Sequence, residues 1–536
     1  MSLRTRIRDR LTDGDDRLPI GLTLLCAAIA ATLVFPLAWL VIEAVAVERD
    51  RAVDLVFSAG TADVLVNSLL LMAGVTAASI LIGVPLAYLT ARTDLPFRRF
   101  WSVAAALPLV VPSYVGAFSF VSAFGPQGEF HEVLAPLGVE RVPEVSGLSG
   151  SILVITLYTY PYVYLTTRAA LLSFDTTLLE AARTLNHGRL AAFRRVTLPT
   201  IRPAIGAGSL LAALYAVSDF GTPSIMRLPV FTRQIYVEYN AFGRDYAALL
   251  SLQLLVVVVL VLALEWAVRS DRETSGDDAG RTDDRVSLGR WRWPATLLPA
   301  GVSAFALLVP LWILGLWLVN SEAGRRPSLA FEPIQVLNSV SVSAAAAVVA
   351  ALAAIPIAYF AANHDSPLAV VFERATYVGF AVPGIVLALA LVYFGSGYAP
   401  WIYQTLPLLI FAYVVRFLPQ AVGSTRTSIL QVDRRLVEAG RTLGESPTGA
   451  FRRVTFPLTR SGIVAGAALV FLTTMKELPV TLVLRPSGFD TIVTQIWRAQ
   501  STALYQYAVV PTLILLLISG LSMVVILTQE GGEEGL

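Results

Sequence analysis

Two carboxylates, Asp219 and Glu477, lie inside long apolar stretches of this sequence and are the residues with the clearest capacity for chemistry. An ionised side chain at membrane depth is costly, so it usually faces a cavity or a compensating charge. The two positions are equivalent in an internal repeat with a separation of 258 residues. Two symmetric carboxylates facing one path would favour a cation over an anion such as a phosphonate. We therefore expect both to line a translocation path. The alternative is that Lys476 or a backbone group neutralises Glu477 structurally.

Other kinds of reactive site have little support in the sequence. Cys26 is the single cysteine, and His131, His187 and His364 lie far apart, so no metal-ligand or disulfide pattern is present. The single lysine, Lys476, is followed by glutamate, whereas a phosphate-binding Walker A loop ends in Gly-Lys-Ser/Thr. We expect no catalytic residue, no assigned metal site and no cofactor bound by this chain. The net charge of +2 gives no basic field for nucleic acid.

A polar segment occurs twice, as EAARTLNHGRLAAFRRVTLP at 180–199 and EAGRTLGESPTGAFRRVTFP at 438–457. Each copy predicts a short helix, a turn and a second helix that ends at the proline. Gly444 suits a left-handed turn, and Asn186, its counterpart, is among the residues that tolerate that conformation best after glycine. The positions singled out in the two copies are Glu180, Ala181, Ala182, Asn186, Gly188 and Pro199, and Glu438, Ala439, Gly440, Gly444 and Pro457.

Some of these residues also have a simpler structural interpretation. Thr177 and Glu180 fit a capping box, which would make Glu180 a helix-start residue. The pairs Arg194-Arg195 and Arg452-Arg453 could contact a partner protein or could anchor the chain at the cytoplasmic face.

The elements that must position these residues are membrane-spanning helices. Hydrophobic residues make up 56% of the 536 residues and charged residues only 15%, against roughly 25% in soluble domains. A spanning helix needs roughly 20 mostly apolar residues, and the sequence predicts about twelve of them. The expected spans are 20–46, 63–90, 100–124, 151–173, 201–224, 247–268, 294–319, 336–361, 370–395, 402–424, 461–483 and 506–528.

Arginine placement predicts the orientation. The N-terminal leader and the loops after the second, fourth and tenth expected spans are rich in arginine, which favours the cytoplasmic side. The loop 125–149 is acid-rich and falls on the other side. We expect a multi-pass protein of the cell (inner) membrane with both termini cytoplasmic.

The chain is predicted to hold two six-span domains, 1–268 and 294–536, joined by a charged cytoplasmic linker, 269–293. Val66-Asn67-Ser68 matches Leu337-Asn338-Ser339, and the polar segments at 180–199 and 438–457 match each other. Because each unit has an even number of spans, the repeats run parallel. The predicted fold is an all-α polytopic membrane protein with pseudo-twofold symmetry.

The duplicated polar segment resembles the cytoplasmic coupling loop of ABC-importer permeases, which reads Glu-Ala-Ala, then a glycine, then a proline-ended stretch. This resemblance implies that each copy sits in a cleft of an ATPase subunit and passes its ATP-driven closure to the spans. It implies two separate ATPase subunits, which use the ATP, and an extracytoplasmic solute-binding protein. The membrane lipid is the remaining expected partner.

Several further segments resemble the iron(III) branch of these importers, at 107–128, at 218–226 with 231–236, and at 476–486 with 488–497. The resemblance covers nearly the whole chain and implies ferric iron as the substrate. Thiamine, polyamine or phosphonate permeases are the alternatives within the class. A secondary transporter or channel is the alternative from another class, and it would need no ATPase. A membrane enzyme has less support.

Overall fold

The computed structural model describes residues 19–125, 128–134, 143–174, 191, 193–269, 286–319, 330–364 and 366–530. These residues form helices and no strand beyond one isolated bridge between Thr93 and Val286. Within them, nine helices are long and apolar enough to cross a membrane, or eleven if each of two bent pairs counts as one span. A shorter apolar helix covers Tyr505–Leu521. The predicted all-α polytopic membrane fold is confirmed.

The chain groups into two compact units, and each contains segments of both halves of the sequence. Unit 1 comprises Met1–Leu40, Pro333–Thr491 and Leu521–Leu536, and unit 2 comprises Val41–Glu332 and Ile492–Gly520. These units are defined by contacts between residues. The predicted domain limits are defined by the sequence repeat and stay a prediction, at 1–268, 269–293 and 294–536. Much of the predicted linker, 270–285, lies outside the described residues.

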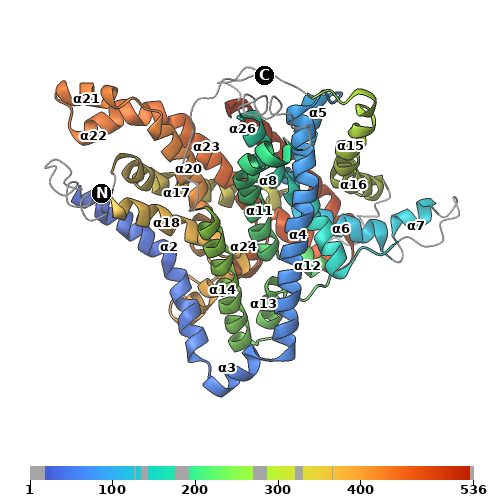
Figure 1. Cartoon of the computed structure of the whole chain (residues 1–536). Coiled ribbons are helices and arrows are strands. Elements are labelled where there is room, and N and C mark those ends of the chain that lie inside the picture. The colour runs from blue at the N-terminus through green and yellow to red at the C-terminus, as the bar shows by residue number, and fades with distance from the viewer. Residues whose placement is uncertain are drawn as a thin grey trace. The chain divides into compact units, whose positions relative to one another are not determined.

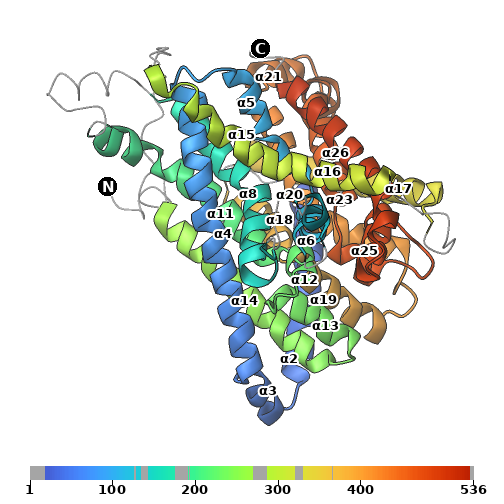
Figure 2. The ribbon, with the colours of Figure 1, turned by 90° about the vertical axis from the view of Figure 1, so that its right-hand side faces the viewer.

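Unit 2 is built on three packed helices, α4 (Ala59–Arg92), α8 (Gly147–Leu172) and α11 (Leu198–Ser218). Figure 2 shows α4 running alongside α8 and α11. The other helices of this unit are α3 (Arg49–Val56), α5 (Arg98–Ala104), α6 (Ser113–Phe124), α7 (Glu129–Leu134), α12 (Gly221–Ile225), α13 (Phe231–Asn240), α14 (Arg244–Arg269), α15 (Leu297–Ser303), α16 (Val309–Val319), α25 (Ile492–Ser501) and the first part of α26 (Val509–Glu530).

Unit 1 has a matching core of α17 (Pro333–Asn363), α20 (Leu406–Leu430) and α23 (Phe456–Met475) (Figure 1). Its other helices are α2 (Ile20–Ala46, to Leu40), α18 (Pro367–Ala381), α19 (Gly384–Gly397), α21 (Arg434–Thr442), α22 (Pro447–Ala450) and α24 (Pro479–Leu484). Aromatic contacts hold α2 on α19, with ring centroids 5.0 Å apart for Phe35 and Phe394 and 4.2 Å apart for Trp39 and Tyr398.

Equivalent glycines bring the core helices together in both units. A Cβ on Gly208 of α11 would lie 2.6 Å from Cα of Val163, and one on Gly466 of α23 would lie 2.9 Å from Cα of Ala421. Both pairs are related by the same 258-residue separation. Small residues allow this close approach where lipid supplies no hydrophobic drive for association. The repeat inferred from sequence therefore extends to equivalent helix packing.

Two predicted spans are wrong in shape because each is broken at a proline. The stretch 100–124 bends by 94° between Val110 and Ser113, and 370–395 bends by 99° between Ala381 and Gly384. The residue before each proline, Val111 or Val382, is extended, with ψ of 124° and 126°. Proline disfavours helical backbone at the residue before it, which accounts for both breaks.

The predicted spans 201–224 and 461–483 also end earlier than expected. Helix α11 stops at Ser218, and Asp219 adopts extended backbone before the short helix α12. Helix α23 stops at Met475, and Glu477 lies before α24. Both carboxylates therefore occupy helix breaks rather than continuous helices.

Candidate functional site

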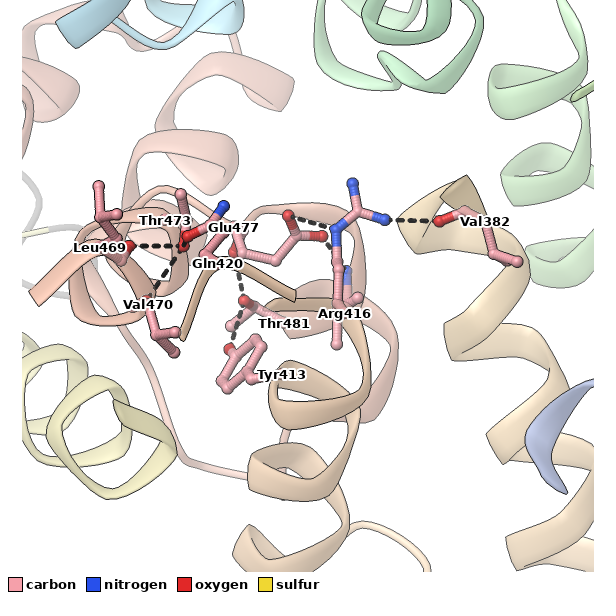
Figure 3. A network of polar contacts seen from close by, with 10 residues as sticks. Val382, Tyr413, Arg416, Gln420, Leu469, Val470, Thr473, Glu477 and Thr481 are labelled. Carbon is pink, nitrogen blue, oxygen red and sulfur yellow. Dashed lines mark hydrogen bonds and ion pairs between the residues drawn. The ribbon is translucent and has the colours of Figure 1, made fainter. Parts of the chain in front are cut away.

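The carboxylate of Glu477 lies opposite a guanidinium in unit 1. Arg416 Nε of α20 is 3.3 Å from Glu477 Oε2, and the two side chains are only 14% and 8% exposed. Arg416 Nη1 also donates to the carbonyl of Val382, at 2.9 Å. That carbonyl belongs to the bend before Pro383, so one arginine ties the broken helix to the carboxylate, as Figure 3 shows.

Hydroxyl groups extend this network on the other side of Glu477. Thr481 Oγ1 donates to the backbone carbonyl of Glu477, and Tyr413 Oη lies 2.7 Å from Thr481 Oγ1. These contacts join α20 to α24 around the helix break. Arg416 is the compensating charge, and neither it nor this network was predicted from the sequence.

Gly384 makes the close approach of Glu477 possible. A Cβ at this position would lie 2.5 Å from Glu477 Oε1 and 3.1 Å from Arg416 Nη1. A side chain would therefore displace the carboxylate from its ion pair. The glycine follows the bend directly, so the bend and the carboxylate position depend on each other.

Asp219 has a different environment at the equivalent break of unit 2. Ser113 Oγ lies 3.1 Å from both Asp219 carboxylate oxygens, and Tyr215 Oη donates to Ser113 Oγ at 3.2 Å. Thr232 Oγ1 donates to the Asp219 carbonyl at 2.7 Å. Over the described part of the chain, Asp219 forms no ion pair.

The repeat explains this difference residue by residue. Ser113 stands where the other half has Gly384, and Tyr158 stands where it has Arg416. Tyr158 donates instead to the carbonyl of Ala306, at 3.1 Å. One half thus holds a charge-compensated carboxylate, and the other holds a carboxylate supported by a hydroxyl relay.

The second copy of the polar segment forms the predicted helix, turn and helix. Asp433 caps α21 by accepting from the Arg435 backbone N–H at 2.9 Å. Gly444 has φ of 92°, the left-handed conformation expected of it. Glu445 pairs with Arg453 within the segment, so Arg453 has an intramolecular partner.

The surface of α21 is exposed along its length. Glu438 and Ala439 are exposed, Gly440 is half-buried, and none of the helix residues is buried. Leu443, directly after it, is 87% exposed, and Leu436 is 50% exposed. An apolar surface on a projecting polar helix is typical of a protein-binding site.

Most of the first copy lies outside the described residues, including Glu180, Ala181, Ala182, Asn186 and Gly188. Pro199 occupies the first turn of α11, as Pro457 does in α23, so each proline begins a long helix and the predicted helix end at the proline is wrong. Proline is tolerated in the first turn because the backbone N–H that it lacks would have no helical partner there. The identical sequence Phe-Arg-Arg-Val-Thr forms a π-helix just before each of these helices, at Phe193–Thr197 and Phe451–Thr455. Tyr88 contacts Phe193 edge to face at 5.4 Å, and Tyr359 contacts Phe451 at 5.1 Å.

Each polar segment is therefore joined by one helix to one carboxylate. Helix α11 runs from the first segment to Asp219, and α23 runs from the second segment to Glu477. At 1.5 Å per residue, these helices are about 30 Å long, which is the thickness of a bilayer core. Figure 1 shows α21 and α22 at the end of α23 that is remote from α24. The two kinds of candidate site thus lie at opposite ends of one rigid element.

Residues 79–270 and 354–529 each match the family described as the binding-protein-dependent transport system inner membrane component. The chain belongs to this family. The two matches confirm the duplicated architecture, and membership makes the chain a membrane permease subunit. The family implies a solute-binding protein and an ATPase as partners.

Several curated relatives of this family are similar over long stretches. The chain is 31% identical over 511 residues to the Fe(3+)-transport system permease protein of Haemophilus influenzae, covering 94% of this chain and 97% of the relative. It is 24% identical to the ferric transport system permease protein of Actinobacillus pleuropneumoniae, over 77% of this chain and 63% of the relative. A probable molybdenum ABC transporter permease of Haloferax volcanii is 31% identical over 46% of this chain and 90% of its own length.

Proposed function

We propose that this permease moves ferric iron into the cytoplasm, driven by ATP hydrolysis in separate subunits. The observation that supports the substrate is the near full-length similarity to the iron permease of Haemophilus influenzae. The Asp219 carboxylate, which has no ionic partner among the described residues, favours a cation as well. The molybdenum permease, in contrast, covers less than half of this chain.

The geometry supports a lever mechanism in each repeat. An ATPase that binds the exposed surface of α21 and Leu443 would displace the N-terminal end of α23. The helix would transmit this displacement to the break at Glu477. A π-helix at the base of the lever is a common feature of functional sites. The edge-to-face contact of Tyr359 with Phe451 links α17 to the same base.

Asp219 is the better candidate for contact with the cargo. Its charge lacks an ionic partner in the described structure, whereas Arg416 already compensates Glu477. Ser113 supports the Asp219 carboxylate, and Gly221 and Thr222 interact with it as well, but all of these groups are neutral. Glu477 would then fix the position of its helix break through the ion pair with Arg416 and would not bind the cation.

The proposed assembly contains one permease chain, two ATPase subunits and one solute-binding protein. ATP is used by the ATPase subunits, and this chain binds no cofactor. Both termini are proposed to be cytoplasmic, since the arginine-rich loops and the polar segments then lie on the ATPase side.

The test is uptake by proteoliposomes that contain the permease, its ATPase and its binding protein. We expect radiolabelled ferric iron to accumulate only with ATP and the binding protein. An ion gradient without ATP should cause no accumulation. Molybdate, thiamine, a polyamine and a phosphonate serve as competing substrates. Uptake of any of these in preference to iron would overturn the substrate, and uptake driven by a gradient without ATP would overturn the mechanism.

A further inference from the structure

A cavity of about 610 Å³ in unit 2 is lined by two arginines, Arg227 and Arg233, and bordered by three aromatic side chains. It lies beside the start of α8, where the Gly147 backbone N–H donates to the carbonyl of Met226 at 3.0 Å. The polar segment at 180–199 follows the other end of α8. This helix is about 39 Å long at 1.5 Å per residue, so the cavity lies at the end of α8 that is remote from Leu172.

Arg227 and Arg233 both line this cavity, and neither forms an ion pair among the described residues. Burial and the charge of Arg227 both lower the pKa of Arg233. Glu144 is the one carboxylate that lines the cavity, and it forms no ion pair in the described structure. The cavity therefore has an excess of positive charge.

The equivalent arginine in the other half of the repeat has an ion-pair partner and therefore a structural role. Arg485 is the counterpart of Arg227, and it is paired with Asp490 five residues later. The first half has no acidic residue between 228 and 235. Arg227 also adopts a left-handed backbone with φ of 57°, which is costly for a residue with a Cβ.

The aromatic side of the cavity is fixed by packing. The Phe220 ring lies 4.9 Å from that of Tyr236 and 5.2 Å from that of Trp497. Tyr505 stacks on Trp317 at 5.3 Å. A rigid wall with two adjacent fork-shaped donors suits a compact oxyanion, because guanidinium binds carboxylate and phosphate oxygens in pairs.

We propose that this cavity is a binding site for a small oxyanion, with Arg227 and Arg233 as its ligands. A bound anion would also cancel the field that two arginines present to a trivalent cation entering from this side. That consequence rests on the proposed iron transport, whereas the binding site itself does not.

The test uses the full chain in lipid nanodiscs and measures equilibrium binding of labelled inorganic phosphate at low ionic strength. We expect one saturable site. Arg227→Gln and Arg233→Gln should each weaken it at least about tenfold, the equivalent of about 1.4 kcal/mol. Arg227→Lys should retain part of the affinity, since it keeps the charge but loses the paired donors. The control is Arg290→Gln, an exposed arginine away from the cavity with the same loss of charge.

Glu144→Gln distinguishes a direct effect on binding from a loss of folding, because a misfolded variant would not bind more tightly. It should strengthen phosphate binding severalfold by removing the one negative charge at the cavity. The absence of saturable binding by the unaltered chain would overturn the proposal. Equal loss in Arg233→Gln and Arg290→Gln, or unchanged affinity in Glu144→Gln, would overturn it as well. Competition by added phosphatidylglycerol would identify a lipid headgroup as a source of the oxyanion. None of these measurements depends on iron uptake, so failure here leaves the proposed function standing.

Discussion

At the scale of single residues, the two repeat-related carboxylates are not equivalent. Glu477 is paired with Arg416, and Asp219 is supported by Ser113. Taking a charge out of water is costly unless a partner compensates it. Loss of a partner should therefore destabilise the fold at the Glu477 site, whereas a change at the Asp219 site should reduce transport.

Removing Arg416 alone should destabilise the protein strongly. Arg416→Met leaves Glu477 buried without its partner, a change that costs about 3–5 kcal/mol in comparable pairs. The double variant Arg416→Met/Glu477→Gln should recover most of that loss. Thermal unfolding in detergent, run as a double-mutant cycle, measures the coupling. The more exposed pair of Arg426 and Glu373, 3.6 Å apart, is the matched control and should show about 1 kcal/mol or less. Additive effects at Arg416 and Glu477 would contradict the prediction.

Asp219→Asn should leave folding nearly intact and reduce transport. The amide keeps the size of the side chain and can still accept from Ser113, so the unfolding midpoint should shift little. Loss of the charge should lower iron uptake at least about tenfold if the carboxylate contacts the cation. Uptake at the original rate, with the assembly intact, would remove Asp219 from the path.

At the scale of elements, the exposed turn after α21 is the feature most directly tied to coupling. A Cβ at Gly444 would face open space, so the cost of Gly444→Ala comes from its φ of 92° alone, about 1 kcal/mol. That strain should loosen the turn and reduce ATP-driven uptake and ATPase co-purification together, with little change in the membrane helices. Gly423→Ala, in α20 with open space and ordinary backbone, should have no such effect. Equal behaviour of the two variants would show that the turn conformation is unimportant.

Much of the element layout could be predicted because it depends on local signals. The first span, 20–46, was predicted with the limits that the structure has, since hydropathy alone decides it. The turn at Gly444 followed from a single residue with unusual backbone freedom. Pro112 and Pro383 recur in both halves and favour kinks at these positions. The spans 100–124 and 370–395 were nevertheless predicted as continuous, because apolar residues continue through both prolines and hydropathy reports depth in the membrane rather than direction.

Long-range partners could not be predicted in the same way. Arg416 and Glu477 are far apart in the sequence, and no local pattern pairs them. A signal did exist, since Arg416 lies inside the expected span 402–424, and an intramembrane arginine calls for an intramembrane acid. The cap of α21 also had a signal in Asp433, whose residue type favours that position. The packing of α2 on α19 within unit 1 had none.

At the scale of the whole molecule, duplication within one chain sets the expected stoichiometry. Each repeat has a polar segment followed by one long helix, α11 or α23, which is the proposed lever. A permease with two such segments should bind two ATPase subunits, one on each. The sequences of the segments differ at the turn, Asn186 against Gly444, so the two ATPases should bind with different affinities.

Damage to one segment should therefore remove one ATPase and leave the other. Leu443→Asp places a charge on the most exposed apolar residue beside α21 and should not disturb the helix core, because that side chain is 87% exposed. Native mass spectrometry of the purified complex should then change from two ATPases per permease to one, and ATP-driven uptake should fall sharply because both levers must move. The control is Phe242→Asp, a substitution at a comparably exposed residue, 92% exposed, in the turn after α13 and outside both the polar segments and the predicted spans. Retention of two ATPases in Leu443→Asp would place the binding surface elsewhere, and loss of both would mean that neither segment holds an ATPase alone.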